Sequence, residues 1–336
     1  MRRLRKIIFG ISSEEASVRR RGFCCHDERA RVRLERIGLT FLQGYHAALE
    51  AEDDEMLAQR LETMEPELRG FAFEGAAMGL ALLDFLKPWG RGRLKPFIEG
   101  AGAAHVYMLY VGAGWMLARL RRNPARALRN FDPLLGWLAV DGYGFHEGYF
   151  KWPAYITRQE RPPRLSGYAL RAFDQGLGRS LWFVEGADAG RVVDAVAAFA
   201  RERQSDLWSG VGLACAYAGG ADDAGLEHLR AAAGLFAPQL AQGAAFAAKA
   251  RQRAGNKASH TETACRLLCG TTADAAAEVT VVAARLLPRD GEEPAYETWR
   301  QRIASELAFA IVPAAQRRPN GKASAGLHAA PAGRAV

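Results

Sequence analysis

The sequence predicts an all-α fold, and three observations lead to this class. Apolar residues recur at helical spacing along most of the 336-residue chain. Runs that suggest strands, such as 106–111 and 280–283, are short and lie within helical periodicity. Glycines also recur at a nearly constant interval, which is typical of stacked helical hairpins. We therefore expect a helical-hairpin repeat solenoid.

The expected helices follow one another with short turns between them. The first two are separated by an acidic turn at 52–54, and later ones end at Pro88, at Asn123-Pro124 and around Trp152-Pro153. The acidic residues Asp188, Asp206 and Asp222 are suited to cap helix N-termini, as is Ser259. Helices are expected at 40–50, 55–67, 71–86, 97–121, 133–150, 165–184, 189–203, 207–218, 223–236, 238–253, 259–268, 272–287 and 295–311.

A glycine occurs in a similar context seven times. These glycines are Gly44, Gly75, Gly112, Gly142, Gly176, Gly210 and Gly243, at intervals of 31, 37, 30, 34, 34 and 33 residues. A glycine inside a helix costs up to about 1 kcal/mol relative to alanine, so a whole series needs compensation. Close approach of neighbouring helices would provide it. The period near 33 residues indicates a tetratricopeptide-like architecture of about seven helix pairs, although the proline of that motif is absent.

The distribution of charge divides the chain into three segments. Residues 1–36 form a basic N-terminal arm with a net charge of +6, and residues 313–336 form a disordered tail of +4. The single α-helical repeat domain at 37–312 is left with a charge near −2. A nucleic-acid partner is therefore not expected, because its basic footprint would lie on the folded body. The arm is either solvated or an amphipathic contact with a membrane.

The cysteines indicate a reducing compartment. The chain has five, an odd number with no disulfide framework, and no stretch approaches the roughly 20 apolar residues of a membrane span. A cytoplasmic protein is expected, and the basic N-terminus is the point of contact in the alternative in which it associates with a membrane. His260, Cys265 and Cys269 lack the partner motif of a zinc site, so neither a metal nor another cofactor is expected.

Polar side chains precede six of the seven repeat glycines. In a stack, such residues form one line, which is either a buried hydrogen-bonded ladder or a polar track facing a ligand. These residues are Gln43, Glu74, Asp141, Gln175, Ser209 and Gln242. Glu74 and Asp141, together with His146 and Glu147, are the catalytic candidates, because they can exchange protons. Asp141 and His146 are five residues apart, so they do not share a helix face; His146 has the alternative of bonding between repeats.

Aromatic residues lie close to the repeat glycines. They belong either to the core or, in an open arc, to a groove for a long, flat, apolar ligand. The candidates are Trp115, Tyr143, Phe145, Trp182 and Trp208. Arg179 lies on one of the same predicted helices and has the charge to hold a carboxylate or thioester end of that ligand.

Several longer segments resemble a known bacterial family. They are 69–78, 110–115, 132–135, 141–150 (Asp-Gly-Tyr-Gly-Phe-His-Glu-Gly-Tyr-Phe), 175–183, 207–213 and 296–300. They are similar to the family typified by the enediyne biosynthesis protein UnbL, from about Arg21 to Arg302. The resemblance implies a role after the enediyne polyketide synthase, in converting a linear polyene to the enediyne core. It also implies companion proteins, one of them a membrane protein, and provides no catalytic residue.

Two classes of function follow. The chain is an enzyme or enzyme subunit acting on an apolar polyene-type small molecule, or it is a non-catalytic helical-repeat scaffold that binds partner proteins or presents the substrate. The aromatic groove with Glu74 and Asp141 favours the first, and the repeat pattern favours the second.

Overall fold

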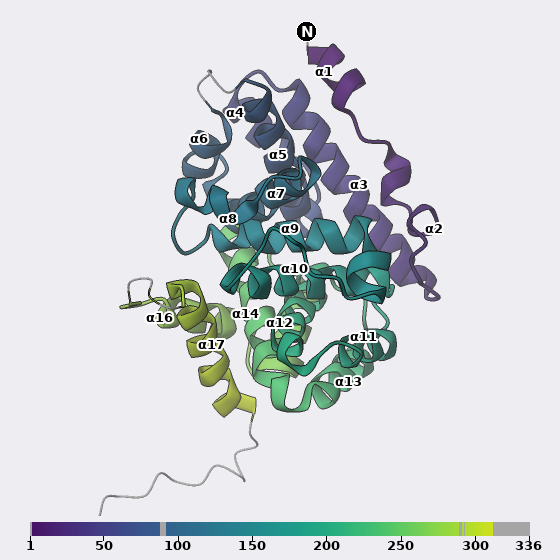
Figure 1. The fold of residues 1–336 in the computed structure, drawn as a ribbon, viewed down its shortest axis with the longest axis vertical. Helices are drawn as coiled ribbons and strands as arrows, with labels where there is room; N and C mark the ends of the chain where they lie inside the picture. Colours follow the sequence, from purple (N-terminus) through teal and green to yellow (C-terminus); the bar gives the residue numbers. More distant parts are fainter. Residues whose placement is uncertain (1, 88–91, 289–290, 292, 312–336) are drawn as a thin grey trace, which may run out of the picture.

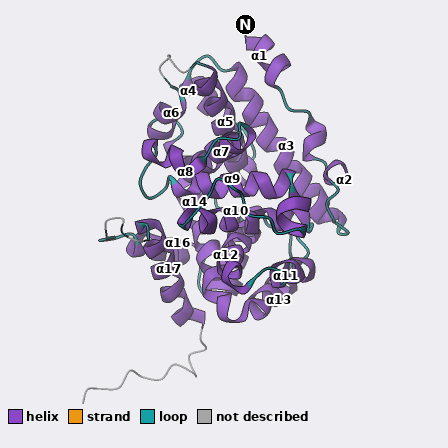
Figure 2. Cartoon of the chain, in the orientation of Figure 1, coloured by secondary structure: helices purple, strands orange, loops and turns teal. Residues whose placement is uncertain are grey.

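The computed structural model describes residues 2–87, 92–288, 291 and 293–311. Helices dominate these ranges, and no strand occurs within them (Figures 1 and 2). This confirms the predicted all-α class. The predicted tail at 313–336 lies outside the described residues.

The chain forms seventeen described α-helices with short 3-10 and π-helical segments between them. In chain order they are α1 (Arg2–Phe9), η1 (Ser13–Ala16), α2 (Val18–Arg21), α3 (Glu28–Glu50), α4 (Asp54–Glu62), α5 (Pro66–Leu86), α6 (Leu94–Glu99), η2 (Ala103–His105), α7 (Val106–Arg119), α8 (Pro124–Ala127), η3 (Leu128–Asn130), α9 (Trp137–Phe150), the π-helix η4 (Pro153–Thr157), α10 (Tyr168–Val184), α11 (Ala189–Ala197), α12 (Arg201–Ala218), α13 (Asp223–Ala233), η5 (Gly234–Phe236), α14 (Ala237–Ala254), α15 (Ser259–Ala264), the π-helix η6 (Cys265–Cys269), α16 (Ala273–Ala283) and α17 (Ala295–Ile311).

Seven helices form a continuous layer in which each packs on the next. The order is α3, α5, α7, α9, α10, α12 and α14, after which α14 packs on α16 and α17. Each of these seven carries one of the recurring glycines. The connections between them differ, because α11 and α13 are full helices whereas only the π-helix η4 separates α9 from α10. The connections between the seven helices are thus uneven in length.

Glycines bring the backbones of neighbouring helices into contact. A Cβ added at Gly176 would lie 1.8 Å from the Asp141 carbonyl oxygen in α9, and one at Gly178 would lie 2.1 Å from the Leu207 oxygen in α12. Because each residue turns the helix by about 100°, residues two positions apart face nearly opposite directions. A Gly-x-Gly pair therefore fits a helix between two close neighbours. These contacts confirm the predicted close approach of the helices.

The same arrangement recurs along the layer. In α7, α9, α10 and α12 a Gly-x-Gly pair contacts the preceding and the following helix, whereas α3 and α14 at the ends each use one glycine. The pairs are Gly112/Gly114, Gly142/Gly144, Gly176/Gly178 and Gly210/Gly212, and the single glycines are Gly44, against the Ala72 oxygen, and Gly243, against the Ser209 oxygen. A carbonyl so close to a Cα leaves no room for any side chain.

The N-terminal segment packs against the helices, which differs from a solvated arm, one of the two alternatives that the sequence left open. It runs alongside α3 in Figure 1, and its apolar side chains Ile11, Ala16 and Val18 are buried. Arg21 also donates a hydrogen bond to the Phe150 carbonyl at the end of α9, at 3.0 Å. The predicted boundary at residue 36 falls inside α3, which begins at Glu28 behind its N-cap Asp27. Small apolar residues scattered among arginines gave little indication of this packing.

No helix within the described ranges has both the length and the hydropathy that crossing a bilayer demands.

Candidate functional site

Most of the polar residues that precede the recurring glycines have hydrogen-bond partners. Gln43, at one end, is exposed. Deeper in the layer, Gln175 Nε2 donates to Asp141 Oδ2 at 2.9 Å, and Ser209 Oγ donates to Gln242 Oε1 at 2.7 Å. These bonds join neighbouring helices and fit the ladder interpretation for four of the six positions.

Asp141 also pairs with Arg179, one turn after Gln175 on α10. Both side chains of this ion pair are almost wholly buried, and the Arg179 guanidinium lies 4.6 Å from the centre of the Phe145 ring. Burial raises the pKa of Asp141, while Arg179 and Gln175 favour its ionised form. Gln175 also donates to the Tyr296 hydroxyl of α17 at 3.2 Å. Asp141 is therefore held by partners on a neighbouring helix, as a structural ion pair would be.

Glu74 is the exception in this polar line. Its side chain is 1% exposed in the middle of α5, and neither carboxyl oxygen has a hydrogen-bond partner among the described residues. Burial raises its pKa from 4.5 to about 8, and the charge of Arg179 and the nearby Trp115 indole oppose this rise. The Trp115 N–H also lacks a hydrogen-bond partner within the described ranges. Buried polar groups without partners are rare in proteins. At neutral pH Glu74 is mostly a neutral acid.

Glu74 lies on the wall of a narrow apolar cavity. The cavity has a volume of about 50 Å³, which is room for a few water molecules at most. Around Glu74 the wall is largely aromatic, and Trp115 packs against Phe41 and Phe145 with ring centres 4.7 and 5.0 Å apart. The lining consists of Ile11, Glu15, Ala16, Leu34, Ile37, Gly38, Phe41, Leu42, Phe71, Glu74, Met78, Trp115, Phe145, Tyr149, Phe150 and Phe183.

The N-terminal segment closes one side of this cavity. Ile11, Glu15 and Ala16 belong to the lining, although they precede every helix of the layer. The segment is held by a 3.4 Å hydrogen bond from the Tyr149 hydroxyl to the Glu15 carbonyl and by the contacts of Arg21 with α9. Access to Glu74 from this side therefore depends on the position of the segment.

Comparison with known proteins gives a family. The model of the family "Protein of unknown function (DUF1702)" matches residues 1–307. The chain belongs to this family. No curated protein and no solved structure matches it. The DUF1702 match includes the N-terminal segment as well as the layer of helices, so both parts of the cavity wall lie within it.

His146 and Glu147 form a separate group in this DUF1702 chain. His146 Nδ1 lies 3.2 Å from Glu147 Oε1, and Glu147 Oε2 pairs with Lys151 at 2.6 Å. Burial lowers the pKa of His146. Burial opposes ionisation of Glu147, but the hydrogen bonds from His146 and Lys151 lower its pKa below the ordinary value. Neither residue lines the cavity, although His146 is near Trp115, with ring centres 5.6 Å apart.

The structure places only some of the ligand-binding candidates at the cavity. Trp115 and Phe145 line the cavity, and Arg179 stacks on Phe145. Trp182 is fully buried and donates to the Gly219 carbonyl at 2.9 Å, which is a packing role. Tyr143 packs against Phe173 at 6.2 Å between ring centres, and Trp208 is buried away from the cavity. Within the described ranges, no cluster of His, Cys, Asp and Glu has the arrangement of a metal site.

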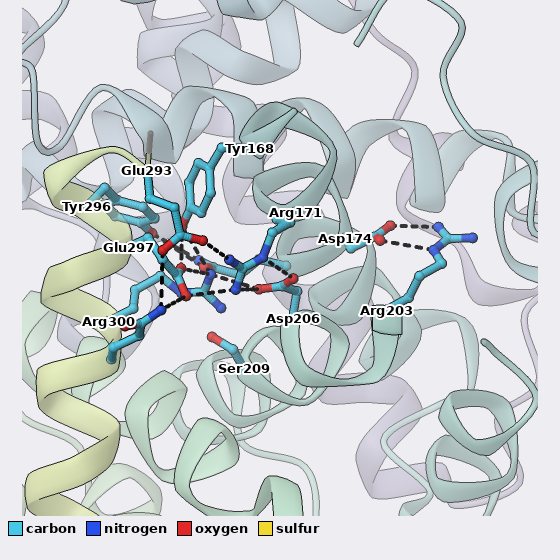
Figure 3. A network of polar contacts seen from close by, with 12 residues as sticks. Tyr168, Arg171, Asp174, Arg203, Asp206, Ser209, Glu293, Tyr296, Glu297 and Arg300 are labelled. Carbon is cyan, nitrogen blue, oxygen red and sulfur yellow. Dashed lines mark hydrogen bonds and ion pairs between the residues drawn. The ribbon is translucent and has the colours of Figure 1, made fainter. Parts of the chain in front are cut away.

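Sequence reasoning missed a polar network that attaches α17 to the layer (Figure 3). Arg300 donates to Asp206 Oδ1 at 2.8 Å and to Glu297 Oε2 at 2.9 Å. Arg171 bonds both carboxylates as well, and Tyr168 donates to Glu297 at 2.7 Å. Asp206, predicted as an N-cap, instead lies inside α12, where it is buried and paired with both arginines. The sequence offered one signal of this network, the acidic residue Asp206 two positions before Trp208 in a mostly apolar stretch.

Proposed function

We propose that the protein takes a slender apolar chain into the cavity beside Glu74 and that this is its role in enediyne biosynthesis. In this proposal it acts after the polyketide synthase, on the conversion of a linear polyene to the enediyne core, together with companion proteins that include a membrane protein. The resemblance to the UnbL family motivates the pathway. The buried carboxyl group of Glu74, for which the described part of the chain offers no hydrogen-bond partner, motivates the site.

The chemistry of Glu74 supports this proposal. A carboxyl group with a pKa of about 8 in an apolar cavity holds its proton at neutral pH and can still release it. It can therefore give a proton to an unsaturated chain beside it or take one from it. The aromatic wall around it suits a flat, conjugated ligand, because π-systems pack well in offset-stacked or edge-to-face arrangements.

The size of the cavity requires a second element. A space of about 50 Å³ is too small for a polyene. Displacement of Ile11, Glu15 and Ala16 would enlarge it on the side that the N-terminal segment closes. In this proposal the segment therefore opens to admit the ligand, and its closure excludes water from Glu74.

Binding of a linear all-trans polyene to the purified full chain tests the proposal. We expect a saturable shift of the polyene absorption bands, lost in A16W, whose indole would fill the cavity from the N-terminal segment. A matched variant, A58W, places the same group on α4, away from the cavity. E74Q should retain binding but lose any product that cells with the full gene set accumulate.

Two results would count against the proposal. Absence of polyene binding, alone and with the companion proteins, would remove its basis. Normal product formation by E74Q would exclude proton transfer by Glu74, although polyene binding would still be supported. That result would favour the alternative of a non-catalytic scaffold.

The repeat architecture belongs to the same proposal. We infer that the seven glycine-bearing helices are units of one helical-repeat stack, with outer helices of uneven length. The near-constant spacing of the glycines and the recurrence of one backbone contact along the layer support this.

A further inference from the structure

A second, larger hollow lies on another part of the molecule. Its volume is about 730 Å³, within the range of ordinary ligand sites. It is formed by the C-terminal ends of α5 and α7, by α8, and by the loop before α10. We call it the arginine groove. Its apolar lining is Ala81, Phe85, Leu94, Ala113, Met116, Leu117, Leu120, Ala127 and Phe131.

The charged residues of the arginine groove all have the same sign. Arg121, Arg122, Arg126 and Arg164 line it, and none of the described residues in its lining is an Asp or Glu. Within the described ranges none of the four forms an ion pair with a carboxylate. The rest of the body at 37–312 carries a net negative charge, near −6 once these four arginines are left out. Four unpaired guanidinium groups around one apolar hollow create a local positive field that favours an anion.

The walls of the groove are held in place by backbone and side-chain bonds. At the end of α7, Arg121 adopts a φ of 52°, and the Arg122 amide donates to the Leu117 carbonyl at 2.8 Å. Arg164 Nη1 donates to the Arg121 carbonyl at 2.7 Å, while Asn123 Nδ2 donates to the Arg164 carbonyl at 2.9 Å. These bonds join the end of α7 to the loop before α10. The groove is therefore formed before any ligand arrives.

The apolar floor and the basic rim are in direct contact. The Arg122 guanidinium lies 5.0 Å from the centre of the Phe85 ring, and Phe85 is one of the exposed large apolar side chains. A ligand that covered Phe85 would thus meet a guanidinium at the same point. A purely apolar molecule would leave these arginines unused, and a small anion would leave the floor unused.

We propose that the arginine groove binds a single-chain amphiphile with an anionic head group. The chain lies along the floor formed by Phe85, Leu117 and Leu120, and the head is held by arginines of the rim, whose planar groups form paired hydrogen bonds with phosphate or carboxylate. The site is separate from the cavity beside Glu74, because the two share no lining residue. It therefore stands whether or not the cavity binds a polyene.

Calorimetry with three twelve-carbon probes, each below its micelle concentration, tests the proposal. Dodecyl phosphate and dodecanoate present the two candidate head groups, and dodecanol presents the chain alone. We expect one saturable site that prefers an anionic probe over dodecanol by at least about tenfold. The better of the two anions identifies the head group. R122E/R126E, two exposed changes, should weaken anion binding at least about tenfold and bring it close to that of dodecanol.

Two further variants make the test specific. R129E reverses an exposed arginine on η3 that does not line the groove, and it should bind within about twofold of wild type. A127W fills the groove without removing charge and should abolish binding of all three probes; it also tests the proposal if R122E/R126E does not fold. Equal binding by wild type and A127W would overturn the proposal. So would binding only to phosphatidylglycerol vesicles, because the surface would then recognise a membrane.

Discussion

Replacing Glu74 by glutamine tests the central electrostatic inference. Burial raises the pKa of Glu74 to about 8 from 4.5. The native state therefore keeps a proton that the unfolded state releases, so its contribution to stability is complete below pH 4.5 and declines as the pH rises towards 8. For these two pKa values, linkage predicts a loss of about 1.4 kcal/mol by pH 5.5 and about 4.4 kcal/mol by pH 8. E74Q cannot lose this proton.

The measured quantity is the difference in unfolding free energy between wild type and E74Q across pH. Urea unfolding followed by tryptophan fluorescence gives it, provided that the m-values agree. Between pH 5.5 and 8 the wild type should lose about 3 kcal/mol relative to E74Q. His105 and His260, whose pKa values burial lowers to about 4, make stability rise with pH, but they do so equally in both proteins. If the glutamine side chain of E74Q changes stability by an amount that does not depend on pH, that amount does not affect how the difference changes between pH 5.5 and 8.

The control for this prediction is E55Q. Glu55 is exposed on α4, so its difference from wild type should be nearly independent of pH in this window. Infrared spectroscopy provides a second readout, a protonated-carboxyl band at pH 7 that is absent from E74Q. A flat difference curve for E74Q, with no such band, would show that Glu74 is ionised and would refute the neutral-acid interpretation.

Two further predictions concern the layer of helices and its attachment to α17. G176A should destabilise the protein by about 2–3 kcal/mol or more in urea, because the new Cβ would meet the Asp141 carbonyl. G190A, in the open helix α11, should instead be neutral or stabilising by up to about 1 kcal/mol; equal midpoints for the two would contradict the packing argument. R300A should cost about 3–5 kcal/mol, since it leaves the buried Asp206 carboxylate with only a partly exposed partner, and it should expose α17 to proteases. Wild-type resistance to proteolysis would contradict that role.

The sequence was informative where a structural requirement is local. Apolar periodicity predicted the helices, and because only glycine allows two helix backbones to approach this closely, the recurring glycines predicted the contacts between them. The two-sided role of a Gly-x-Gly pair is also local, since Gly176 and Gly178 face opposite neighbours. No local sequence pattern encodes the uneven lengths of the connections between these helices. The expectation of about seven helix pairs could therefore not be corrected from the sequence.

The difference between Glu74 and Asp141 could not be predicted from local sequence. Both precede one of the recurring glycines, yet Asp141 is bonded by Arg179 and Gln175 of α10, whereas Glu74 has no hydrogen-bond partner among the described residues. The distinction depends on residues more than thirty positions away. One signal was present, because Arg179 is four residues after Gln175 and so shares its helix face. For the same reason, the contribution of Tyr296 from α17 could not be foreseen.

The paired glycine contacts also restrict how the molecule can move. A helix held by backbone on two opposite sides cannot turn about its own axis without driving a carbonyl into its neighbour, so α7, α9, α10 and α12 each have one rotational setting. α3 has glycine–carbonyl contacts only where it meets α5. On its other side Gly38 contacts the N-terminal segment, where an added Cβ would lie 2.8 Å from the Ala16 Cβ, and Leu34, Ile37 and Phe41 of α3 line the cavity beside Glu74. Rolling of α3 therefore requires the N-terminal segment to move with it, and it would change the width of the cavity while the ion pair of Asp141 stays fixed.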